Sequence, residues 1–366
     1  MTPAVARFVF CRILIGLLFG LASLPALASD TCRVAFDMGS SGIRAGASSS
    51  QAIVRTEFDY LGEWWGGRSL RGAVAPTVAA LRDLPSKGEF SADCEKIGGG
   101  FSAWRLAAQA NVEELTEILE YIHAATGVSI LVIPQSQEGA YGYFGSRLML
   151  GGRMTTTHVL DIGGGSLQIS GEKTSYADAL GQKVWHRELC QVLRGSESAS
   201  CSLQPMTGKE VAVARILLAE RLKPVADKLS GSVTLTAISR PVSRSVLPAV
   251  RQIAAVGVDQ QGFSRLAVTQ AIDRVAPLTT SETASLSGIG PNYAAYLVSD
   301  MLLVEAVLLA TAGNYLDVAE VDLTNIPGLL ADDHAFSWGK HYGCYLDRLR
   351  SIGLQAYESE AASCPQ

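Results

Sequence analysis

Two segments far apart in the chain share one pattern, in which an apolar run ends at an aspartate and a turn of glycine and serine follows. The first is FDMGSSGIR, Phe36 to Arg44, and the second is LDIGGGSLQI, Leu160 to Ile169. Glycine loses more conformational freedom on folding than any other residue, so consecutive glycines indicate that bare backbone is needed there. Successive N–H groups in such a turn can converge on an anion. The repeat predicts two similar halves, each opening with strand, turn and strand.

Hydrophobic periodicity between the two turns alternates between strand and helix. The stretch NVEELTEILEYIHAATG predicts an amphipathic helix capped by Asn111 and Glu114. The run VSILVI predicts a buried strand, and the helix expected after it holds Glu138 in its first turn. Residues 61–100 show weak periodicity, and we expect a surface excursion around one short helix. A single long helix is expected over residues 208–228.

Gly151 and Gly152 end the first part of this pattern, and the strand–turn–strand order then restarts. The chain is 48% hydrophobic and 18% charged, which is typical of a globular protein. Its 366 residues are long enough for two domains. We therefore expect an α/β protein whose first domain spans residues 29–151. The second domain is expected to span residues 152–366 and to end in a mostly helical part.

The first 28 residues have the pattern of a signal peptide. Arg7 and Arg12 flank the start of an apolar run of 12 residues, and Ala26-Leu27-Ala28 offers a small-x-small cleavage site. We expect cleavage after Ala28 and a periplasmic or secreted protein without a stable membrane anchor. An uncleaved anchor is the alternative. No second membrane segment is expected, because Asp300 and Glu305 interrupt the apolar run near the C-terminus.

Export makes the cysteines informative. Cys11 would leave with the signal peptide, and six cysteines would remain. An even number in an oxidising compartment indicates disulfides, for which 15 pairings exist. We favour the near neighbours Cys190–Cys201 and Cys344–Cys364, which leaves Cys32–Cys94. None of the six forms a CxxC pair, so a zinc site is not expected.

The charge balance argues against a nucleic-acid partner. Lys and Arg number 30 against 35 Asp and Glu, so the net charge is −5. Loss of the signal peptide would leave 28 basic and 35 acidic residues and a net charge of −7. Nucleic-acid-binding domains usually carry a basic face. The five histidines show no metal-ligand spacing, and His158 is interpreted as a strand residue.

The two glycine turns predict a shared phosphate site. If the halves face each other, both turns can bind one phosphate chain from opposite sides of a cleft. Asp37 and Asp161 end the strands that lead into the turns, and they would hold Mg²⁺ or Ca²⁺ through water. Two ordinary structural hairpins are the alternative, but they leave the paired aspartates unexplained.

These motifs resemble the phosphate-binding motifs of the actin/hexokinase/Hsp70 superfamily. Within it, the chain is similar to two families: the Ppx/GppA exopolyphosphatases and guanosine pentaphosphatases, and the apyrases, which are nucleoside triphosphate diphosphohydrolases. FSAWRLAAQAN, Phe101 to Asn111, resembles a Ser-Ala-x-Arg segment of these families. IPQSQEGAYGYFGS, Ile133 to Ser146, resembles the segment with their catalytic glutamate. The resemblance implies two ribonuclease-H-like (actin-like ATPase) domains with a central cleft.

The resemblance also implies roles for individual residues. Glu138 would accept the proton of the attacking water, and its place in a helix's first turn favours the ionised form. Ser166 and Gln168 would orient that water. Arg44 and Arg105 would bind phosphate oxygens. The backbone of the two turns would bind phosphate through Gly39, Ser40, Ser41, Gly42, Gly163, Gly164 and Gly165.

Several positions depart from one family or the other. At Gln168 the exopolyphosphatases have glutamate and the apyrases have glutamine. The later glycine pair of the exopolyphosphatases is replaced by Ser239-Arg240, which leaves the role of that loop open. The Trp64-Trp65 pair could stack a nucleobase, although loop anchoring is the commoner role of such a pair. Arg147 is a weaker phosphate-binding candidate.

Three functions remain open from the sequence. The first is hydrolysis of polyphosphate or guanosine pentaphosphate, which releases the terminal phosphate. The second is the same chemistry on nucleoside di- and triphosphates, and the third is a phosphate-ligand binding protein without turnover. A polyphosphate or nucleoside polyphosphate is the expected partner, and a homodimer is compatible with the sequence. The complete set Asp37, Glu138, Asp161, Ser166 and Gln168 argues against the third function.

Overall fold

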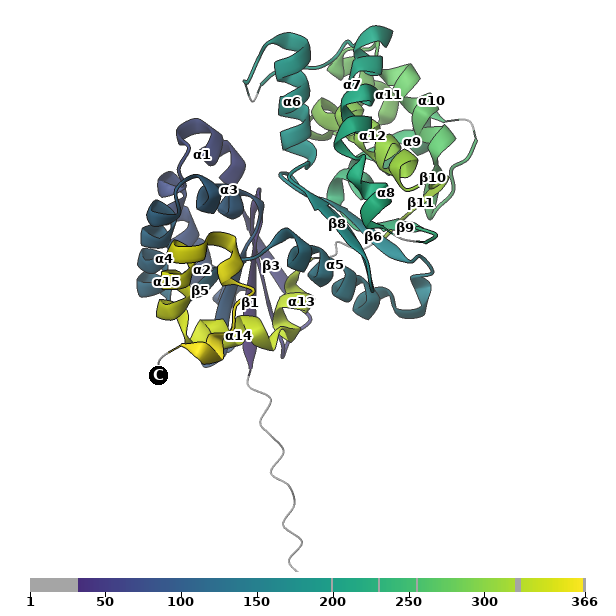
Figure 1. Cartoon of the computed structure of the whole chain (residues 1–366). Coiled ribbons are helices and arrows are strands. Elements are labelled where there is room, and N and C mark those ends of the chain that lie inside the picture. Colours follow the sequence, from purple (N-terminus) through teal and green to yellow (C-terminus); the bar gives the residue numbers. More distant parts are fainter. Residues whose placement is uncertain (1–31, 199, 230, 255, 320–323, 365–366) are drawn as a thin grey trace, which may run out of the picture. The chain divides into compact units, whose positions relative to one another are not determined.

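The computed structural model describes residues 32–198, 200–229, 231–254, 256–319 and 324–364. The expected signal peptide, its cleavage site after Ala28 and Cys11 lie outside these residues. The described chain has the expected α/β fold, in which helices pack on two separate β-sheets (Figure 1).

The first sheet has the strand order β3-β2-β1-β4-β5. Strands β1, β2 and β3 are antiparallel neighbours, whereas β4 and β5 run parallel to β1. This is the expected strand–turn–strand opening followed by parallel crossovers. The strands are β1 (Arg33–Met38), β2 (Gly42–Ala47), β3 (Ile53–Glu57), β4 (Glu95–Gly100) and β5 (Ser129–Val132).

The second sheet repeats this topology. Its order is β10-β11-β9-β6-β7-β8, so β8-β7-β6-β9-β11 corresponds to β3-β2-β1-β4-β5 and β10 is added at one edge. The register repeats as well: Asp37 pairs with Arg44, and Asp161 pairs with Gln168. The strands are β6 (His158–Ile162), β7 (Leu167–Gly171), β8 (Ser175–Asp178), β9 (Leu235–Ala237), β10 (Gly262–Ser264) and β11 (Tyr315–Val318).

Helices from both ends of the chain surround the first sheet. They are α1 (Tyr60–Gly67), α2 (Val74–Lys87), α3 (Ser102–Ala110), α4 (Val112–Thr126), α13 (Ile326–Ala331), α14 (Asp333–Lys340) and α15 (Tyr342–Ile352). Helix α5 (Gln135–Leu150) packs on β6, β7 and β8 of the second sheet and against α13. Short 3₁₀ turns lie at Arg71–Ala73, Gly151–Arg153, Gly353–Ala356 and Ala361–Ser363. As expected, Asn111 caps α4 by accepting a hydrogen bond from the Glu114 N–H at 3.1 Å.

The C-terminal helices belong to the first core, although the sequence-based boundary grouped residues 152–366 together. Leu329 of α13 lies against Gly99 of β4, and Gly339 of α14 lies against Ile97. On the other face of β4, Gly100 lies against Trp104 of α3. The chain thus returns to the first sheet after completing the second. Apolar periodicity identifies a buried face but not which of two sheets covers it.

The second sheet is covered by a mostly helical segment. Its helices are α6 (Gln182–Arg194), α7 (Gly208–Arg221), α8 (Pro224–Lys228), α9 (Leu247–Ile253), α10 (Arg265–Val275), α11 (Thr280–Ser287) and α12 (Pro291–Ala310), with a π-helical turn at Val242–Val246. Adjacent residues of β6 point to opposite faces. Leu160 joins the large core around α12, and Val159 joins a small cluster with Met154 and Ile238.

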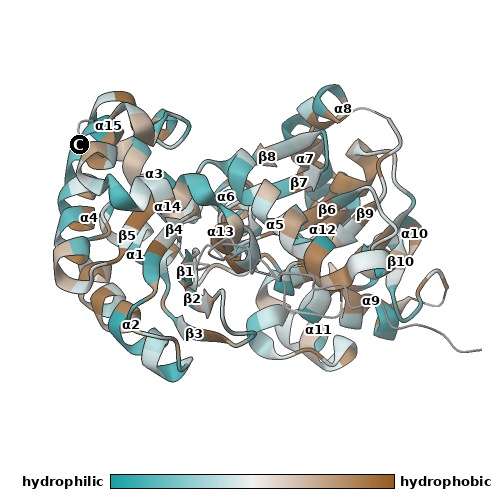
Figure 2. Cartoon of the chain, turned by 90° about the horizontal axis from the view of Figure 1, so that it is seen from below, coloured by the Kyte–Doolittle hydropathy of each residue, from teal (hydrophilic) through white to brown (hydrophobic). Residues whose placement is uncertain are grey.

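Helix α12 is the apolar segment that Asp300 and Glu305 interrupt. Among the described residues it is long and apolar enough to span a membrane by length and composition, but most of it is buried inside the second core. Figure 2 shows much of its ribbon as hydrophobic. Arg215 of α7 pairs with Glu305 at 2.7 Å, and Gln182 donates to Asp300 at 2.5 Å. The two carboxyls are thus accommodated inside the protein, as expected for a buried helix.

Two other expectations about local structure were wrong. Residues 61–100 are not a surface excursion around one helix, because they form most of α1, then α2 and β4, and bury Leu61, Trp64 and Leu81 in the first core. The helix expected over residues 208–228 is divided into α7 and α8. Pro224 has no backbone N–H, so it cannot continue the hydrogen bonding of α7 and instead starts α8.

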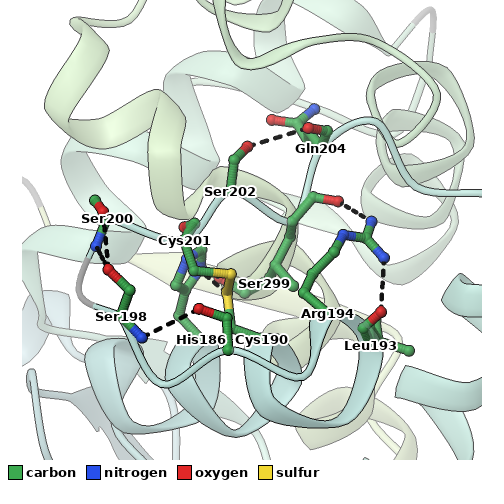
Figure 3. Close-up of a disulfide and its surroundings, with 12 residues drawn as sticks. His186, Cys190, Leu193, Arg194, Ser198, Ser200, Cys201, Ser202, Gln204 and Ser299 are labelled. Atoms are coloured by element: carbon green, nitrogen blue, oxygen red, sulfur yellow. Dashed lines mark hydrogen bonds between the residues drawn. A yellow bond between two sulfur atoms is a disulfide. The ribbon is translucent and has the colours of Figure 1, made fainter.

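The three disulfides have the favoured pairing: Cys32–Cys94, Cys190–Cys201 and Cys344–Cys364. The first and third belong to the first core and the second belongs to the second core; in each bond one cysteine is buried in the core and the other packs against it. Figure 3 shows Cys190–Cys201 fastening the loop after α6 to that helix. In the same region, His186 Nε2 contacts the Cys201 carbonyl at 3.1 Å and Arg194 donates to the Leu203 carbonyl at 2.5 Å.

Candidate active site

A cavity of about 270 Å³ lies where the two aspartate–glycine turns meet. Both turns line it, as do residues from α3, α5, β3 and the segment after β9. Its polar lining includes Asp37, Ser40, Ser41, Arg44, Arg55, Glu57, Ser102, Glu138, Asp161, Ser166, Gln182, Ser239, Arg240, Tyr293, Thr324 and Asn325. Most of the predicted site residues are therefore brought together at one cavity.

The first turn has its carbonyl groups occupied by protein donors. The Gly39 N–H donates to the Gly42 carbonyl at 3.0 Å, which closes the turn between β1 and β2. The Ser40 carbonyl accepts from the Leu61 N–H at 3.3 Å, near the start of α1. Because these carbonyls are engaged elsewhere, N–H groups are what the turn can offer to a ligand. This suits an anion.

The second turn is built the same way. The Gly163 N–H donates to the Ser166 carbonyl at 2.9 Å. The carbonyls of Gly163 and Gly164 accept from the Gln182 and Lys183 N–H groups at 2.9 and 2.8 Å, at the start of α6. Each turn is thus supported by the first turn of a helix that binds its carbonyls. The repeated motif extends from sequence and strand register to backbone hydrogen bonding.

The two turns approach each other so closely that side chains would not fit at the glycines. A Cβ on Gly164 would lie 2.3 Å from Ser40 Oγ, and a Cβ on Gly165 would lie 2.0 Å from Ser102 Oγ. Both distances are shorter than any normal non-bonded contact. The approach of the first turn and of α3 therefore accounts for Gly164 and Gly165, whereas a Cβ on Gly163 would make only an ordinary contact.

Glu138 lies at this meeting point, in the first turn of α5. Arg105 Nη2 pairs with Glu138 Oε2 at 2.7 Å, and Gln168 Nε2 donates to the same oxygen at 2.9 Å. Helix α5 lies tightly on β7 here, because a Cβ on Gly139 would be 2.1 Å from Ser170 Oγ. That close packing holds the Glu138 carboxylate against Gln168.

Arg105 lies behind the carboxylate and does not line the cavity. Its Nη1 donates to the Ile133 carbonyl at 3.0 Å, and its Nη2 also donates to Ser166 Oγ at 3.2 Å. Gln168 Nε2 donates to Ser166 Oγ at 3.0 Å as well. Arg105, Ser166 and Gln168 therefore form one buried network around Glu138. The sequence-based role of Arg105 as a phosphate ligand does not match this placement.

Burial raises the pKa of the Glu138 carboxyl. The Arg105 guanidinium and a hydrogen bond from Ser166 lower the pKa, whereas the negative charge of Asp37 raises it further. The sequence-based expectation that the first turn of a helix favours the ionised form thus left out burial, which acts in the opposite direction. A carboxylate with a raised pKa is a stronger base than an exposed one.

Asp37 and Asp161 end β1 and β6 and line the cavity. Asp37 Oδ2 accepts from Arg44 Nη1 and from the Asn325 N–H, each at 3.4 Å. Burial raises the pKa of Asp161 to about 7, and the negative charges of Glu138 and Asp37 add to the increase, while Arg44 opposes it. Among the described residues, this end of the cavity thus holds the carboxyls of Asp37, Glu138 and Asp161 against the guanidiniums of only Arg44 and Arg105.

This excess of carboxylate fits a divalent cation. Within the described residues, no three His, Cys, Asp or Glu side chains lie close enough to bind a metal ion together. The protein can therefore supply two carboxylates, and water would complete the coordination. Mg²⁺ in particular keeps several waters in protein sites, so the donor set fits the expected ion.

Ser102 is a site residue that the sequence analysis did not identify. It starts α3 with φ of 31°, a conformation uncommon for residues other than glycine. Its Oγ is buried, lines the cavity and has no hydrogen-bond partner among the described residues. Strained backbone and an unsatisfied hydroxyl at a cavity wall are typical of binding residues. The resemblance of its segment to the Ser-Ala-x-Arg pattern was the sequence signal that could have identified Ser102.

The two weaker candidates, the Trp64–Trp65 pair and Arg147, lie away from the cavity. Trp64 is buried in the first core, and Trp65 packs against that core beneath the Arg187 guanidinium. Both lie in α1, so their packing supports anchoring of that helix to the first core and not anchoring of a loop. Arg147 is exposed and does not line the cavity. His158 is held in β6, where its Nε2 contacts Thr174 Oγ1 at 3.0 Å.

A family model extends over much of this site. The model of the Ppx/GppA phosphatase family matches residues 102–323, from the Ser-Ala-x-Arg segment through Glu138 and the second glycine turn to the end of the second sheet. The chain belongs to the Ppx/GppA phosphatase family. It therefore belongs to the actin/hexokinase/Hsp70 superfamily, as the motifs indicated.

Solved structures of Ppx/GppA proteins have the same fold. The Aquifex aeolicus Ppx/GppA phosphatase in its type II variant has a TM-score of 0.60 and 17% identity, over 82% of this chain and 98% of that chain. Another structure of the Aquifex aeolicus family member has a TM-score of 0.62 and 17% identity, over 82% and 96%. An exopolyphosphatase from Cytophaga hutchinsonii has a TM-score of 0.58 and 15% identity, over 82% and 96%. No curated protein sequence matches the chain.

Membership in the Ppx/GppA family supports phosphoanhydride hydrolysis as the general activity. Ppx/GppA enzymes generally use divalent metal ions, which agrees with the excess carboxylate beside the two turns. The family also indicates polyphosphate or a nucleoside polyphosphate as the class of substrate.

Proposed function

We propose that this Ppx/GppA protein is an exported hydrolase that releases the terminal phosphate of a phosphoanhydride by attack of a water activated by Glu138. The observation that carries the proposal is the position of Glu138: it lines the cavity between the two turns, and Arg105 and Gln168 hold its carboxylate. The turns offer N–H groups to the phosphate, and the base lies beside them.

The reaction needs a base, positioning of the water and neutralisation of phosphate charge. Glu138 accepts a proton from water as the water oxygen forms a bond to the terminal phosphorus. The bond between that phosphorus and the bridging oxygen breaks, and the shortened substrate leaves with the bonding electron pair. The N–H groups of the two turns and the Arg44 guanidinium stabilise the charge on the phosphate oxygens.

The remaining residues position these groups. Arg105 holds Glu138 from behind while donating to Ser166 Oγ. Gln168 donates to Glu138 Oε2 and to Ser166, so it fixes one carboxylate oxygen and leaves the other, Oε1, to accept the proton. The free Ser102 hydroxyl is available to the phosphate or to the attacking water.

Asp37 and Asp161 would hold Mg²⁺ or Ca²⁺ through water. When bound, the cation would neutralise charge on the phosphate oxygens. Arg44 lies 3.4 Å from Asp37 and would keep that carboxylate oriented towards the cation.

Polyphosphate or guanosine pentaphosphate is the substrate class that the family favours. Hydrolysis of nucleoside di- and triphosphates is the second candidate. It is favoured by Gln168, which stands where the exopolyphosphatases have glutamate and the apyrases have glutamine. The three disulfides support export, because such bonds persist in oxidising compartments.

One panel of phosphate-release assays tests the proposed activity and its substrate. Purified protein is incubated with polyphosphate, ATP, ADP, GTP and ppGpp, each with Mg²⁺, with Ca²⁺ or with EDTA. We expect release with a divalent ion and none with EDTA. If none of these substrates is hydrolysed with either ion, the proposed activity is wrong and a binding role is favoured.

Replacing Glu138 tests the assignment of the base. We expect Glu138→Gln to lower kcat by about 10²–10⁴-fold with little change in KM, since the amide keeps the shape but cannot accept the proton. Glu113→Gln is the matched control, because Glu113 also lies in the first turn of a helix but is exposed and does not line the cavity. Near-full activity of Glu138→Gln would rule out the proposed base.

A further inference from the structure

Part of the cavity wall has no role in the proposed hydrolysis. Arg55 and Glu57 of β3, Ser239 and Arg240 after β9, and Tyr293 of α12 all line the cavity. None of them belongs to the two turns or to the network around Glu138. We call Arg55, Ser239 and Arg240, the three side chains of this part that can donate to an anion from a cation or an unpaired hydroxyl, the outer subsite.

The outer subsite concentrates positive charge. Asp37, Arg44 and Arg55 form a row across three neighbouring strands, in which Arg44 pairs directly with each of the other two. Two like charges directly opposite each other on adjacent strands are destabilising. Arg44 at least has Asp37 as a partner at 3.4 Å. Arg55 thus places a second guanidinium beside that of Arg44 on this wall.

Arg240 approaches the same wall from the other sheet. It shares Glu57 with Arg55: Glu57 Oε1 is 2.9 Å from Arg55 Nη2 and 3.7 Å from Arg240 Nη1. Burial lowers the pKa of the Arg240 guanidinium, and the charges of Arg44 and Arg55 lower it further. Two guanidiniums thus depend on one carboxylate that is 56% exposed. An anion between them would relieve this repulsion.

Ser239 gives a second and independent indication of a ligand. Its side chain lines the cavity and is only 6% exposed, yet its Oγ has no hydrogen-bond partner among the described residues. Leaving a buried hydroxyl unpaired is unfavourable, so such groups usually mark a bound water, ion or ligand. An oxyanion beside Arg240 would accept a hydrogen bond from this hydroxyl.

We propose that Arg55, Ser239 and Arg240 bind the third phosphate, counted from the attacked end, so that they select a substrate that continues with phosphate over one that continues with a nucleoside. This rests on the proposed phosphoanhydride hydrolysis. The subsite offers a hydroxyl and two guanidinium forks, which match successive phosphate oxygens. A nucleoside placed there would be neutral and would leave both arginines unneutralised. The exopolyphosphatase pattern has two glycines in place of Ser239-Arg240, so these side chains are an addition in this chain.

The test compares ligands that differ only at the distal end. Tripolyphosphate and ADP both have two phosphates at one end. In tripolyphosphate a third phosphate follows, and in ADP adenosine follows. Pyrophosphate has the two phosphates alone. Binding of each is measured by titration calorimetry with Mg²⁺ in the Glu138→Gln background, and released phosphate is assayed at the end of each titration. Because binding is measured directly, the result does not depend on turnover.

We expect Arg240→Gln to weaken tripolyphosphate binding about tenfold or more, because it removes charge-assisted hydrogen bonds. Pyrophosphate and ADP should change by less than about threefold, since neither places a third phosphate in the outer subsite. Arg153→Gln is the matched control: it removes the same charge from an exposed arginine outside the cavity. Arg240→Lys should restore part of the affinity.

Three results would overturn the outer subsite. One is equal tripolyphosphate affinity of Arg240→Gln and Arg153→Gln, and another is absence of tripolyphosphate binding. The third is a loss for ADP as large as that for tripolyphosphate, which would make a nucleotide the occupant. If Arg240→Gln does not fold, Ser239→Ala gives the same comparison with a smaller change. Failure of hydrolysis with tripolyphosphate binding intact would reject the proposed activity but not the subsite.

Discussion

Gln168 shows at the residue scale how closely the base and its support are coupled. It lies opposite Asp161 in the β6–β7 hairpin and donates to Glu138 across the gap to α5. In the first hairpin the corresponding position is Arg44, opposite Asp37. The duplicated turn has thus been used for two tasks: one copy carries a cationic side chain at the cavity, and the other carries a neutral amide that orients the base.

Replacing Gln168 with glutamate should move the pH dependence of the reaction. Two carboxylates in contact within a buried site repel each other and share a proton, so the pKa of the base rises. In Gln168→Glu we expect the acidic limb of the kcat/KM profile to move up by about one pH unit or more. The measurement is kcat/KM from about pH 5 to pH 9 with the best substrate of the panel.

The control for this prediction separates charge from hydrogen bonding. Gln168→Met removes the hydrogen bonds to Glu138 and Ser166 without adding a charge. Its activity should fall, but its acidic limb should move less than that of Gln168→Glu. An acidic limb of Gln168→Glu that coincides with the wild type would mean that Glu138 is not the titrating base.

Individual site residues were predictable where the motif itself carries the chemistry. Asp37, Asp161 and the glycines follow from the turn pattern, and Glu138 follows from the resemblance of its segment. Ser102 and the placement of Arg105 could not be predicted in the same way. Both depend on how the first turn of α3 meets the second glycine turn, a long-range contact that leaves no periodic signal in the sequence.

At the scale of elements, the sequence predicted the segments with a strong apolar pattern and missed those without one. Helix α4 has regular apolar spacing and a capping asparagine, and it forms as expected. Strand β4 was missed because EKIGGG contains three glycines, which have low strand propensity. Here Gly99 and Gly100 are needed for the close approach of Leu329 and Trp104. Packing therefore outweighed local propensity.

Helix α12 carries a titratable group that should make stability depend on pH. Asp300 is buried, and one of its oxygens has no hydrogen-bond partner among the described residues. Burial raises the pKa of Asp300 well above the ordinary aspartate value, and the hydrogen bond from Gln182 lowers it only in part. The folded protein thus holds a proton that the unfolded chain releases. Its contribution to stability is greatest below the ordinary pKa and declines as pH rises towards the folded-state pKa.

Asp300→Asn should remove this pH dependence while keeping an acceptor for Gln182. We expect the variant to gain stability over the wild type as pH rises from about 4 towards the folded-state pKa, by roughly 1.4 kcal/mol per unit. Chemical denaturation at about pH 4.5 and pH 8 measures this difference. Asp83→Asn, on the exposed face of α2, is the control. An equal effect of Asp300→Asn at both pH values would contradict the prediction.

At the scale of the whole molecule, the duplication of the glycine turns was visible in the sequence, but the path of the chain between the two cores was not. The sequence predicted two halves in succession, whereas residues 326–364 return to the first core. Helix α5 links the cores, because Tyr141 packs in the first and Gly139 lies against β7 of the second sheet. Such a return depends on tertiary contacts between distant segments.

The disulfides divide between the cores in the same way. Cys32–Cys94 and Cys344–Cys364 both belong to the first core, and Cys190–Cys201 belongs to the second. No disulfide among the described residues joins the two cores. Cys32–Cys94 has a sequence separation of 62, against 11 for Cys190–Cys201. The longer loop restricts the unfolded chain more. By loop entropy the two bonds contribute about 4 and about 3 kcal/mol.

We therefore expect the double variant Cys32→Ser/Cys94→Ser to lose more unfolding free energy than Cys190→Ser/Cys201→Ser. The expected losses are about 4 and about 3 kcal/mol, and chemical denaturation of both variants measures them. Non-reducing peptide mapping of the exported wild-type protein should give the three pairs and no free thiol. Each double variant leaves the other two bonds intact, so each serves as the control for the other. Free thiols at all six positions in the exported protein would mean that these bonds do not form. The stability comparison would then have no basis, and the cysteines would no longer support export.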